Sequence, residues 1–466
     1  MDSTPLLKRQ LSVVPAIAER LTSSPDSMPF KARFIFERVL SNSLAFLNCK
    51  ASAERLVVLP GLRGVGKTTL LLQLYQGIAK AGVPPERLLY LPCDRLAALP
   101  GATLTDALHG YEAILGADLA MQKDRTFILL DEVQYVPDWG LAVKSVFDEA
   151  RSVQVIVSGS SAVALRMNAD VARRADACRI APLGFIEYLA LTGHDIRPGA
   201  TPGELADTSD SESALRFFKK HASMVGAKLA LLPNLEHLIR RFLYAGSLPS
   251  TMGDADPNTA WAKTYRSIER IVNVDLQGIG HFDRSTLQAA MPAITLVADS
   301  AERSVQKMAV ELSLPPATML SLMDALVKAD LLLEVPVAGS AGRGVRRKKR
   351  RYFTAPSMMA AVLDASGNDP SDRQGPLLEA AVANVLSRVP GTSVRYDDAE
   401  GGADFLLQGR LKAVVEVGWG NKNDRQVKSS MARYKVPWGI LVCRCPAPSL
   451  NGRVVHVPVE QFLALE

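Results

Sequence analysis

Apolar residues recur along the chain with two different spacings, and each spacing predicts a different kind of structure. Within residues 1–50 they recur every three or four positions, which predicts helices. The positions that carry this spacing are Leu11, Val14, Ile17 and Leu21. Further along, short apolar runs are separated by longer helical stretches, at residues 56–59, 88–91, 127–130 and 155–157. Such alternation is typical of a parallel sheet wrapped by helices, so we expect an α/β domain here.

The pattern changes at residues 196–213, which are rich in Gly, Pro, Ser and Asp and predict a loop. A mostly helical region follows, and we expect it to form a lid. Two helical segments, residues 304–312 and 317–328, then flank a Pro-Pro turn and precede an apolar strand at residues 331–335. The order helix, turn, helix, strand predicts a winged helix.

The last part of the chain opens with a helix and continues with three apolar strands, at residues 403–407, 413–417 and 439–443. At 466 residues the chain is too long for a single hydrophobic core. We therefore expect an N-terminal helical segment, an α/β core, a helical lid, a winged helix and a C-terminal α/β domain. The boundaries of these five parts are residues 1–50, 51–195, 196–290, 291–365 and 366–466.

Composition narrows the class of protein. Hydrophobic residues make up 48% and charged residues 22%, as in ordinary globular proteins. The five cysteines are scattered, which indicates neither a disulfide framework nor a zinc site. Because no apolar stretch approaches the roughly 20 residues that span a bilayer, we expect no membrane partner and a cytoplasmic location. The formal charge of +6 permits an anionic partner.

A glycine-rich loop joins the first apolar run to a helical stretch, and its sequence is Gly61-Leu62-Arg63-Gly64-Val65-Gly66-Lys67-Thr68. This is a Walker A motif, whose glycines let backbone N–H groups turn around a phosphate. The following helix presents its positive N-terminal end to the same anion. We expect Lys67 to reach the β- and γ-phosphates of ATP and the Thr68 hydroxyl to bind Mg²⁺. The predicted nucleotide contacts are Gly61, Gly64, Gly66, Lys67, Thr68 and Thr69.

A second acidic element follows the run at residues 127–130, which ends in Asp131 and Glu132. We expect Asp131 to hold Mg²⁺ through water and Glu132 to polarise the water that attacks ATP. The next apolar run ends in Ser158-Gly159-Ser160-Ser161. Either Ser158 or Ser160 is placed to sense the γ-phosphate, although serines there also cap helices.

Arg173 and Arg174 end the following helical segment. An arginine at such a position can complete a neighbouring subunit's ATP site, and a solvated pair of charges is the alternative. Arg173 is therefore a candidate catalytic residue supplied in trans.

The order of these motifs resembles bacterial and archaeal AAA+ ATPases related to the STAND branch. Three segments carry the resemblance: residues 130–139, residues 158–161, and Pro182-Leu183-Gly184-Phe185-Ile186-Glu187-Tyr188-Leu189. Residues 246–249 and 271–275 are also similar to that family. The resemblance implies a P-loop AAA+ parallel sheet with a lid, then a winged helix and a restriction-endonuclease-like C-terminal domain.

A basic run precedes Tyr352 and holds seven positive charges between residues 343 and 351. If exposed on a wing, it would bind the phosphates of DNA, and RNA or an acidic partner are alternatives. The predicted contacts are Arg346, Arg347, Lys348, Lys349, Arg350 and Arg351. The second predicted helix offers few side chains that read base edges, so binding should be structure-directed or non-specific.

The C-terminal part carries acids placed as in a nuclease of the PD-(D/E)xK type. Glu379 lies on a predicted helix, and Asp404 and Glu416 lie on successive predicted strands. Such carboxylates bind Mg²⁺ and activate water against a phosphodiester. Gly418 stands where the catalytic lysine should share the strand face with Glu416, and Lys422 would have to loop back. We therefore expect a degenerate domain without nuclease activity.

These features predict a Mg²⁺-dependent ATPase that couples turnover to DNA remodelling or translocation in repair, recombination or mobile-element defence. With this hypothesis we expect the chain to form a homo-oligomeric ring, which could be a hexamer. Two alternatives stay open: a STAND-like nucleotide switch that controls protein assembly, and an ATP-regulated nuclease.

Overall fold

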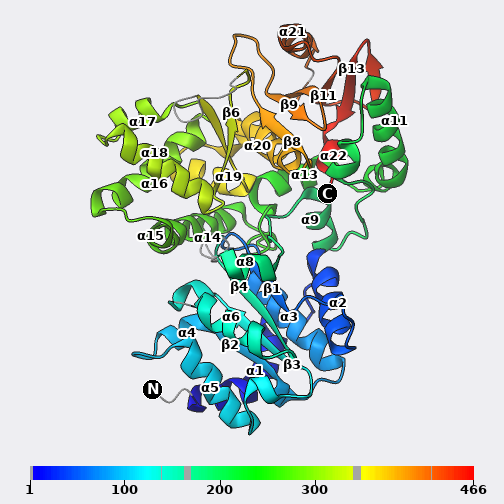
Figure 1. Cartoon of the computed structure of the whole chain (residues 1–466). Coiled ribbons are helices and arrows are strands. Elements are labelled where there is room, and N and C mark those ends of the chain that lie inside the picture. Colours follow the sequence, from blue (N-terminus) through cyan, green and yellow to red (C-terminus); the bar gives the residue numbers. More distant parts are fainter. Residues whose placement is uncertain (1–3, 138, 162–168, 340–347, 421) are drawn as a thin grey trace. The chain divides into compact units, whose positions relative to one another are not determined.

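The computed structural model describes residues 4–137, 139–161, 169–339, 348–420 and 422–466. These residues form two compact units, residues 1–181 and 182–466. Each unit contains its own sheet, as Figure 1 shows.

The first unit is built on a five-stranded parallel sheet with the order β2-β3-β4-β1-β5. Its strands are β1 (Leu56–Pro60), β2 (Leu88–Pro92), β3 (Thr126–Asp131), β4 (Val153–Gly159) and β5 (Asp176–Ala177). The first four contain the four predicted apolar runs, whereas the sequence pattern does not predict the short β5. Because β1, β3 and β4 are buried at every position, their apolar runs are continuous rather than alternating.

Helices cover this sheet, and one buried core joins alternate strand residues to α5 and α6. Its helices are α1 (Thr4–Leu21), α2 (Ile35–Leu47), α3 (Lys67–Lys80), α4 (Cys93–Ala97), α5 (Leu104–Leu115), α6 (Trp139–Glu149) and α8 (Ala169–Arg174). The predicted N-terminal helices are α1 and α2. The sheet, its helices and the glycine-rich loop after β1 together confirm the P-loop AAA+ fold.

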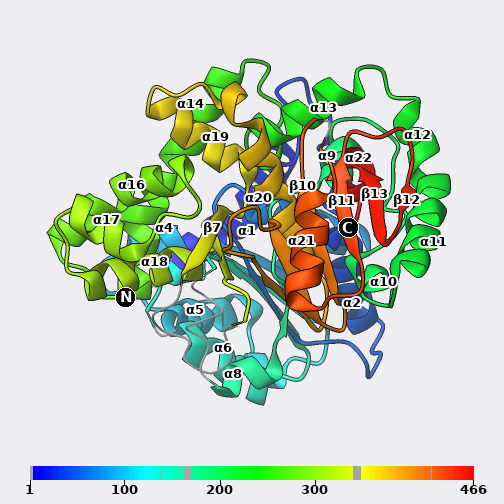
Figure 2. The ribbon, with the colours of Figure 1, turned by 90° about the horizontal axis from the view of Figure 1, so that it is seen from above.

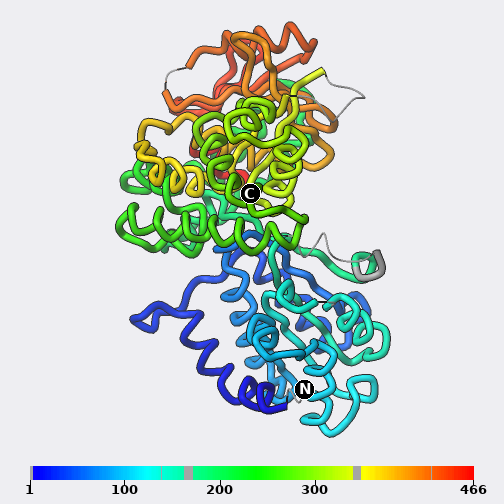
Figure 3. The backbone as a smooth tube through the Cα atoms, turned by 90° about the vertical axis from the view of Figure 1, so that its left-hand side faces the viewer, coloured from blue at the N-terminus to red at the C-terminus, as the bar shows by residue number. Residues whose placement is uncertain are grey.

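The second unit begins with a mostly helical region, drawn green to yellow in Figure 3. Its helices are α9 (Phe185–Leu191), α10 (Pro202–Leu205), α11 (Ser211–His221), α12 (Ala227–Ala230), α13 (Leu235–Arg241), α14 (Pro257–Arg270), α15 (Leu276–Ile279), α16 (Arg284–Asp299), α17 (Val305–Glu311), α18 (Pro316–Lys328) and α19 (Pro356–Ala365). Three π-helical turns interrupt the described part of this region. Two of them, Phe242–Gly246 and Ile271–Asp275, overlap the segments at residues 246–249 and 271–275 that resemble the AAA+ family.

An antiparallel hairpin of β6 (Leu332–Pro336) and β7 (Lys349–Phe353) follows α17 and α18. The described elements thus occur in the order predicted for a winged helix. Within the described part of the chain no single helix is long and apolar enough to cross a membrane. The pair α17 and α18 passes that test only jointly, bent by 113° at the break between them.

The C-terminal sheet has six strands in the order β12-β13-β11-β10-β9-β8 and mixes parallel and antiparallel pairs. Its strands are β8 (Thr392–Arg395), β9 (Phe405–Gly409), β10 (Ala413–Val417), β11 (Gly439–Cys443), β12 (Ser449–Asn451) and β13 (Val454–Pro458). Three helices accompany it in Figure 2: α20 (Gln374–Ser387), α21 (Arg425–Tyr434) and α22 (Val459–Leu463). The predicted strands at residues 413–417 and 439–443 are β10 and β11.

Candidate functional site

The glycine-rich loop takes the backbone form that a phosphate-binding loop needs. Gly64 and Gly66 have φ values of 86° and 88°, in the left-handed region that a side chain disfavours. Gly66 is also the N-cap of α3, so the loop leads directly into the helix. The first N–H groups of a helix have no partner within it and are available to an anion.

Lys67 lies beneath this loop, with 4% of its surface exposed. Its Nζ donates to the carbonyl oxygens of Gly61 at 3.0 Å and Leu62 at 3.2 Å. The same Nζ lies 3.6 Å from Oε1 of Glu132. The structure therefore brings Lys67 of the glycine-rich loop together with Glu132, the second of the two acids after β3.

Asp131 ends β3 and is buried, with 3% of its surface exposed. The Ser158 hydroxyl donates to its Oδ1, and the Tyr90 hydroxyl donates to its Oδ2 at 2.8 Å. Burial raises the pKa of Asp131, and hydrogen bonds from Ser158, Thr68 and Tyr90 oppose that rise. These hydroxyls hold the carboxylate in place near Thr68, the other predicted Mg²⁺ ligand.

Glu132 takes a left-handed conformation with φ of 56°, uncommon for a residue with a side chain. Its carboxylate accepts a hydrogen bond from the Gln134 amide, whose Oε1 accepts from the backbone N–H of Ser160 at 3.1 Å. Gln134 thus links the predicted base to the end of β4. The strained backbone and this side-chain link aim Glu132 at Lys67.

Three residues of this site are missing from the sequence prediction: Tyr90, Gln134 and Arg33. Arg33 is buried and donates to the carbonyl oxygens of Val65 at 2.7 Å and Ala181 at 3.0 Å. It thereby ties the segment before α2 to the phosphate-binding loop. The sequence could have indicated Gln134, because it follows Glu132 by two residues. Tyr90 and Arg33 lie far from the motifs in sequence, and only the fold brings them to the site.

The roles predicted for the two serines and for Arg173 in this unit stay predictions. Ser158 contacts Asp131, and Ser160 contributes its backbone N–H to Gln134, so both lie at the site. Arg173 is exposed on α8, and Arg174 is paired with Asp148 at 2.9 Å. A role for Arg173 in a neighbouring subunit stays a prediction.

The basic run at residues 343–351 was expected to expose its charges to DNA, but several of its side chains are buried or paired with acids. Arg346 and Arg347 lie outside the described residues. Cross-strand pairing places Glu334 opposite Arg351, and Glu334 forms ion pairs with both Arg351 and Lys349. Arg351 and Arg350 have side chains only 3% and 12% exposed.

Lys348 is exposed, with 71% of its side chain accessible and Asp398 at 3.6 Å. Glu334 of the hairpin thus neutralises Lys349 and Arg351, and Glu302 and Asp404, from outside the hairpin, neutralise Arg350. Within the described part of the run, the DNA prediction rests on Lys348.

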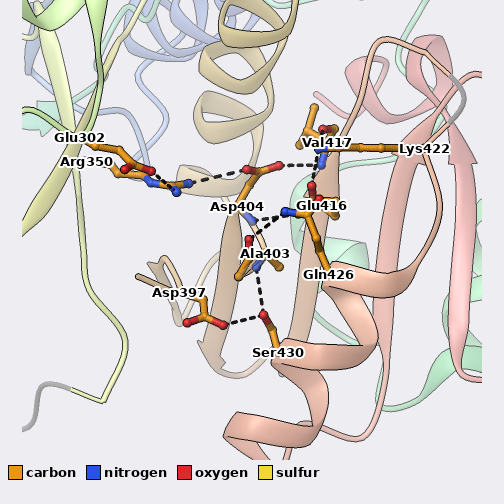
Figure 4. A network of polar contacts seen from close by, with 11 residues as sticks. Glu302, Arg350, Asp397, Ala403, Asp404, Glu416, Val417, Lys422, Gln426 and Ser430 are labelled. Atoms are coloured by element: carbon orange, nitrogen blue, oxygen red, sulfur yellow. Dashed lines mark hydrogen bonds and ion pairs between the residues drawn. The ribbon is translucent and has the colours of Figure 1, made fainter. Parts of the chain in front are cut away.

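The structure brings the C-terminal acids Asp404 and Glu416 together, and a lysine joins them. Figure 4 shows two backbone N–H groups that link the strand of Glu416 to Asp404: the N–H of Asp404 donates to the Glu416 carboxylate at 3.1 Å, and the N–H of Val417 donates to the Asp404 carboxylate at 2.9 Å. Lys422 donates to the Glu416 carboxylate and to the carbonyl oxygen of Val417 at 2.8 Å. Lys422 does loop back.

Glu379 lies on α20 and completes the group. Burial, and then the charge of Asp404, raise the pKa of both Glu379 and Glu416. Burial also raises the pKa of Asp404, whose Oδ1 lies 3.6 Å from the Arg350 guanidinium. Among the described residues, no three His, Cys, Asp or Glu side chains are arranged to hold a metal ion as they stand.

Comparison with known proteins finds a matching domain family and similar proteins in other organisms. Residues 53–189 match the AAA domain family. The uncharacterized protein MJ1637 of Methanocaldococcus jannaschii is 34% identical over 420 residues, which cover 88% of this chain and 85% of that protein. A Haemophilus influenzae protein is 25% identical over 134 residues, covering 28% of this chain and 32% of that protein.

Two solved structures are similar at lower identity. The Aeropyrum pernix ORC1 protein in complex with DNA is 14% identical, with a TM-score of 0.34, over 75% of this chain and 97% of that one. The Thermotoga maritima RuvB Holliday junction branch migration motor is 13% identical, with a TM-score of 0.30, over 68% of this chain and 93% of that one.

Proposed function

Since the chain belongs to the family of the Methanocaldococcus jannaschii protein MJ1637 and contains an AAA domain, we propose that it hydrolyses ATP with Mg²⁺ and couples turnover to DNA. One observation carries the first half of this proposal. Lys67, Asp131 and Glu132 come from two separate motifs and meet at one edge of the sheet, after the phosphate-binding loop.

Each residue has a definite task in this mechanism. Backbone N–H groups of the loop and the start of α3 bind the phosphates, and Lys67 moves from the loop carbonyls to the β- and γ-phosphate oxygens. Thr68 and Asp131 would hold Mg²⁺, which neutralises charge on the phosphates when bound. Glu132 accepts a proton from the attacking water, and Gln134 keeps its carboxylate oriented.

Two variants test the ATPase proposal. Lys67→Ala removes the phosphate contact and should abolish nucleotide binding, whereas Lys80→Ala at the exposed far end of α3 should bind normally. Glu132→Gln should keep binding and lose turnover by about 100-fold or more, because it removes the base alone. Full turnover by Glu132→Gln would exclude Glu132 from that role.

DNA coupling is supported by the order of α17, α18 and the β6–β7 hairpin, by the exposed Lys348 of the basic run and by the net charge of +6. A winged helix with this run on its wing would bind DNA phosphates without reading bases. Replacing Arg346, Arg347 and Lys348 together by alanine should weaken DNA binding and flatten its salt dependence. The matched variant Lys219→Ala/Lys220→Ala, on exposed α11, should leave both unchanged. An unchanged salt slope in the first variant would move the DNA surface elsewhere.

We further propose that the active form is a homo-oligomeric ring in which Arg173 reaches the next subunit's ATP. The support is the AAA domain and the exposed position of Arg173 on α8. Mixing Arg173→Ala with Lys67→Ala subunits tests it. Neither variant alone should turn over ATP, but mixed rings contain interfaces with both intact residues and should recover part of the rate. No recovery, with mixing shown by light scattering, would contradict the trans role.

A further inference from the structure

Two cysteines at the end of β11 are the most closely spaced pair in the sequence. Cys443 is the last residue of the strand, and Cys445 follows it by two positions. Cys443 is buried in an apolar cluster of the C-terminal sheet, and the partly exposed Cys445 packs against the same cluster. The two thiols therefore share one side of the chain, as residues two apart on an extended segment do.

The chain leaves the sheet between these two residues. Cys443 is the last residue of β11 with a partner in the sheet, Pro458 of β13, and the chain bends at Arg444. Two residues of extended strand separate Cα atoms by about 6.6 Å, at the upper end of the range of about 4.4–6.8 Å that a disulfide bridges. A bend shortens this separation, and Cys445 can move without breaking any strand pairing. A disulfide between the two cysteines is therefore compatible with an intact sheet.

The two thiols also interact directly. A hydrogen bond from the Cys445 thiol lowers the pKa of Cys443, although burial opposes this shift. The same hydrogen bond, then burial and the charges of Cys443 and Glu460, raise the pKa of Cys445. Burial also raises the pKa of Cys93 and of Cys178. Because the thiolate is the form that attacks an oxidant, Cys443 is better suited to react first than any of these three thiols.

The residue between the two cysteines makes a contact with a distant helix. Arg444 pairs with Glu236 of α13, and Glu236 also pairs with Arg240 at 2.7 Å. The Arg240 guanidinium lies 5.6 Å from the centre of the Trp419 ring, in the turn after β10. The side chains of Arg444 and Glu236 are 53% and 46% exposed, so burial does not hold this pair together. Its geometry depends on where the backbone places Arg444.

We propose that Cys443 and Cys445 are a redox-active pair that hydrogen peroxide oxidises to a disulfide, and that this disulfide separates Arg444 from Glu236. The ring that the disulfide closes contains the backbone of Arg444, so the torsion angles of that residue change when the sulfurs join. Oxidation then loosens α13 from the end of β11. Neither the ATP site nor the acidic cluster around Glu416 takes part in this reaction.

The reaction consumes one peroxide molecule for each disulfide. The Cys443 thiolate attacks one peroxide oxygen, so that a sulfur–oxygen bond forms, the oxygen–oxygen bond breaks and the other oxygen leaves as water after taking up a proton. The Cys445 sulfur then attacks the sulfenic sulfur of Cys443, and the displaced hydroxide leaves as a second water with the proton of the Cys445 thiol. The two thiols lose two electrons, which the peroxide gains. Dithiothreitol reverses the change by thiol–disulfide exchange.

Peptide mass spectrometry of the full chain tests the disulfide. A protease that does not cut after arginine is needed, because Arg444 lies between the cysteines. After brief treatment with hydrogen peroxide, the peptide that contains both cysteines should be lighter by two hydrogen atoms, and dithiothreitol should restore its mass. Cys445→Ser should abolish this product and leave Cys443 as a sulfenic acid that dimedone traps.

The matched control is Cys49→Ser, which replaces an exposed cysteine elsewhere and should form the disulfide as the wild type does. A wild-type protein in which Cys443 and Cys445 stay reduced while peroxide oxidises Cys49 would overturn the proposal. So would oxidation of Cys443 that stops at the sulfenic acid with Cys445 present.

Hydrogen exchange of the α13 amides tests the structural consequence. Oxidation of the wild type should speed this exchange several-fold, because the contact between Arg444 and Glu236 is lost. Arg444→Ala should show the same faster exchange while reduced, and oxidation should add nothing further. The matched variant Arg453→Ala, exposed in the turn between β12 and β13, should exchange as the wild type does. A disulfide that forms while α13 exchanges as in the reduced protein would overturn the separation of Arg444 from Glu236.

Discussion

Ser430 holds the segment just before β9, which contains Asp404, and its replacement by alanine should destabilise the second unit. Its hydroxyl is fully buried on α21 and makes two hydrogen bonds: it accepts from the N–H of Ala403 at 2.9 Å and donates to Asp397 at 2.6 Å. Asp397 is 2% exposed and also pairs with Arg433. Figure 4 shows this chain of contacts running up to Asp404.

The cost of Ser430→Ala follows from these contacts. A hydrogen bond to a charged group contributes about 1.5–3 kcal/mol, and a buried N–H left without a partner costs about 1–3 kcal/mol. The two effects overlap because Asp397 keeps its other donors and the strand can shift slightly. We therefore expect a loss of about 2–4 kcal/mol, which in a unit of this size lowers the unfolding midpoint by roughly 3–7 °C.

Differential scanning calorimetry of the full chain measures this loss. The matched control is Ser429→Ala, which makes the same substitution at the exposed neighbouring position of α21 and should change stability by less than about 0.5 kcal/mol. Equal, small effects for Ser429→Ala and Ser430→Ala would refute the assignment of Ser430 as the residue that supports β9.

Three further predictions concern single side chains. Tyr90→Phe removes one donor to Asp131 and should slow ATP turnover by about 10-fold in a steady-state assay, with nucleotide affinity largely kept; an unchanged rate would make that bond irrelevant to catalysis. Because burial raises the pKa of Glu379 to about 8 in the folded protein, its ionisation should lower the stability of the wild-type fold as the pH rises from about 5 to 9. Glu379→Gln should remove about 1–3 kcal/mol of that loss. Parallel pH profiles of thermal unfolding for the wild type and Glu379→Gln would contradict this. Arg33→Met should weaken ATP binding several-fold, because it frees the Val65 carbonyl and loosens the phosphate-binding loop; ATP affinity equal to wild type, by fluorescent-nucleotide titration, would remove Arg33 from the site.

The ATP site was largely predictable because its chemistry is local in sequence. The loop that ends in Lys67 and the acids after β3 each lie within a few residues, and the carboxyl ends of parallel strands meet at one edge of a sheet. Tyr90 and Arg33 escaped prediction for the opposite reason. Each reaches the site from a different segment, and nothing in the neighbouring residues distinguishes it from a core tyrosine or a surface arginine.

The second unit shows where residue order misleads. Seven close charges predicted an exposed basic surface, but antiparallel pairing sets Glu334 against Arg351, and tertiary packing brings Glu302 and Asp404 to Arg350. Gly418 likewise predicted a lost lysine, because strand periodicity places residues only within the strand. The turn after β10 returns Lys422 to the same place, which periodicity does not report.

We propose that ATP turnover at Lys67, Asp131 and Glu132 responds to DNA. The most direct measurement is the steady-state ATPase rate with no DNA and with single-stranded, duplex and branched DNA, at low and moderate salt, using Lys67→Ala as the blank. We predict a rate that depends on Glu132 and rises with one DNA form. A Glu132-dependent rate that no DNA form changes would contradict the coupling and favour a nucleotide switch that controls protein assembly.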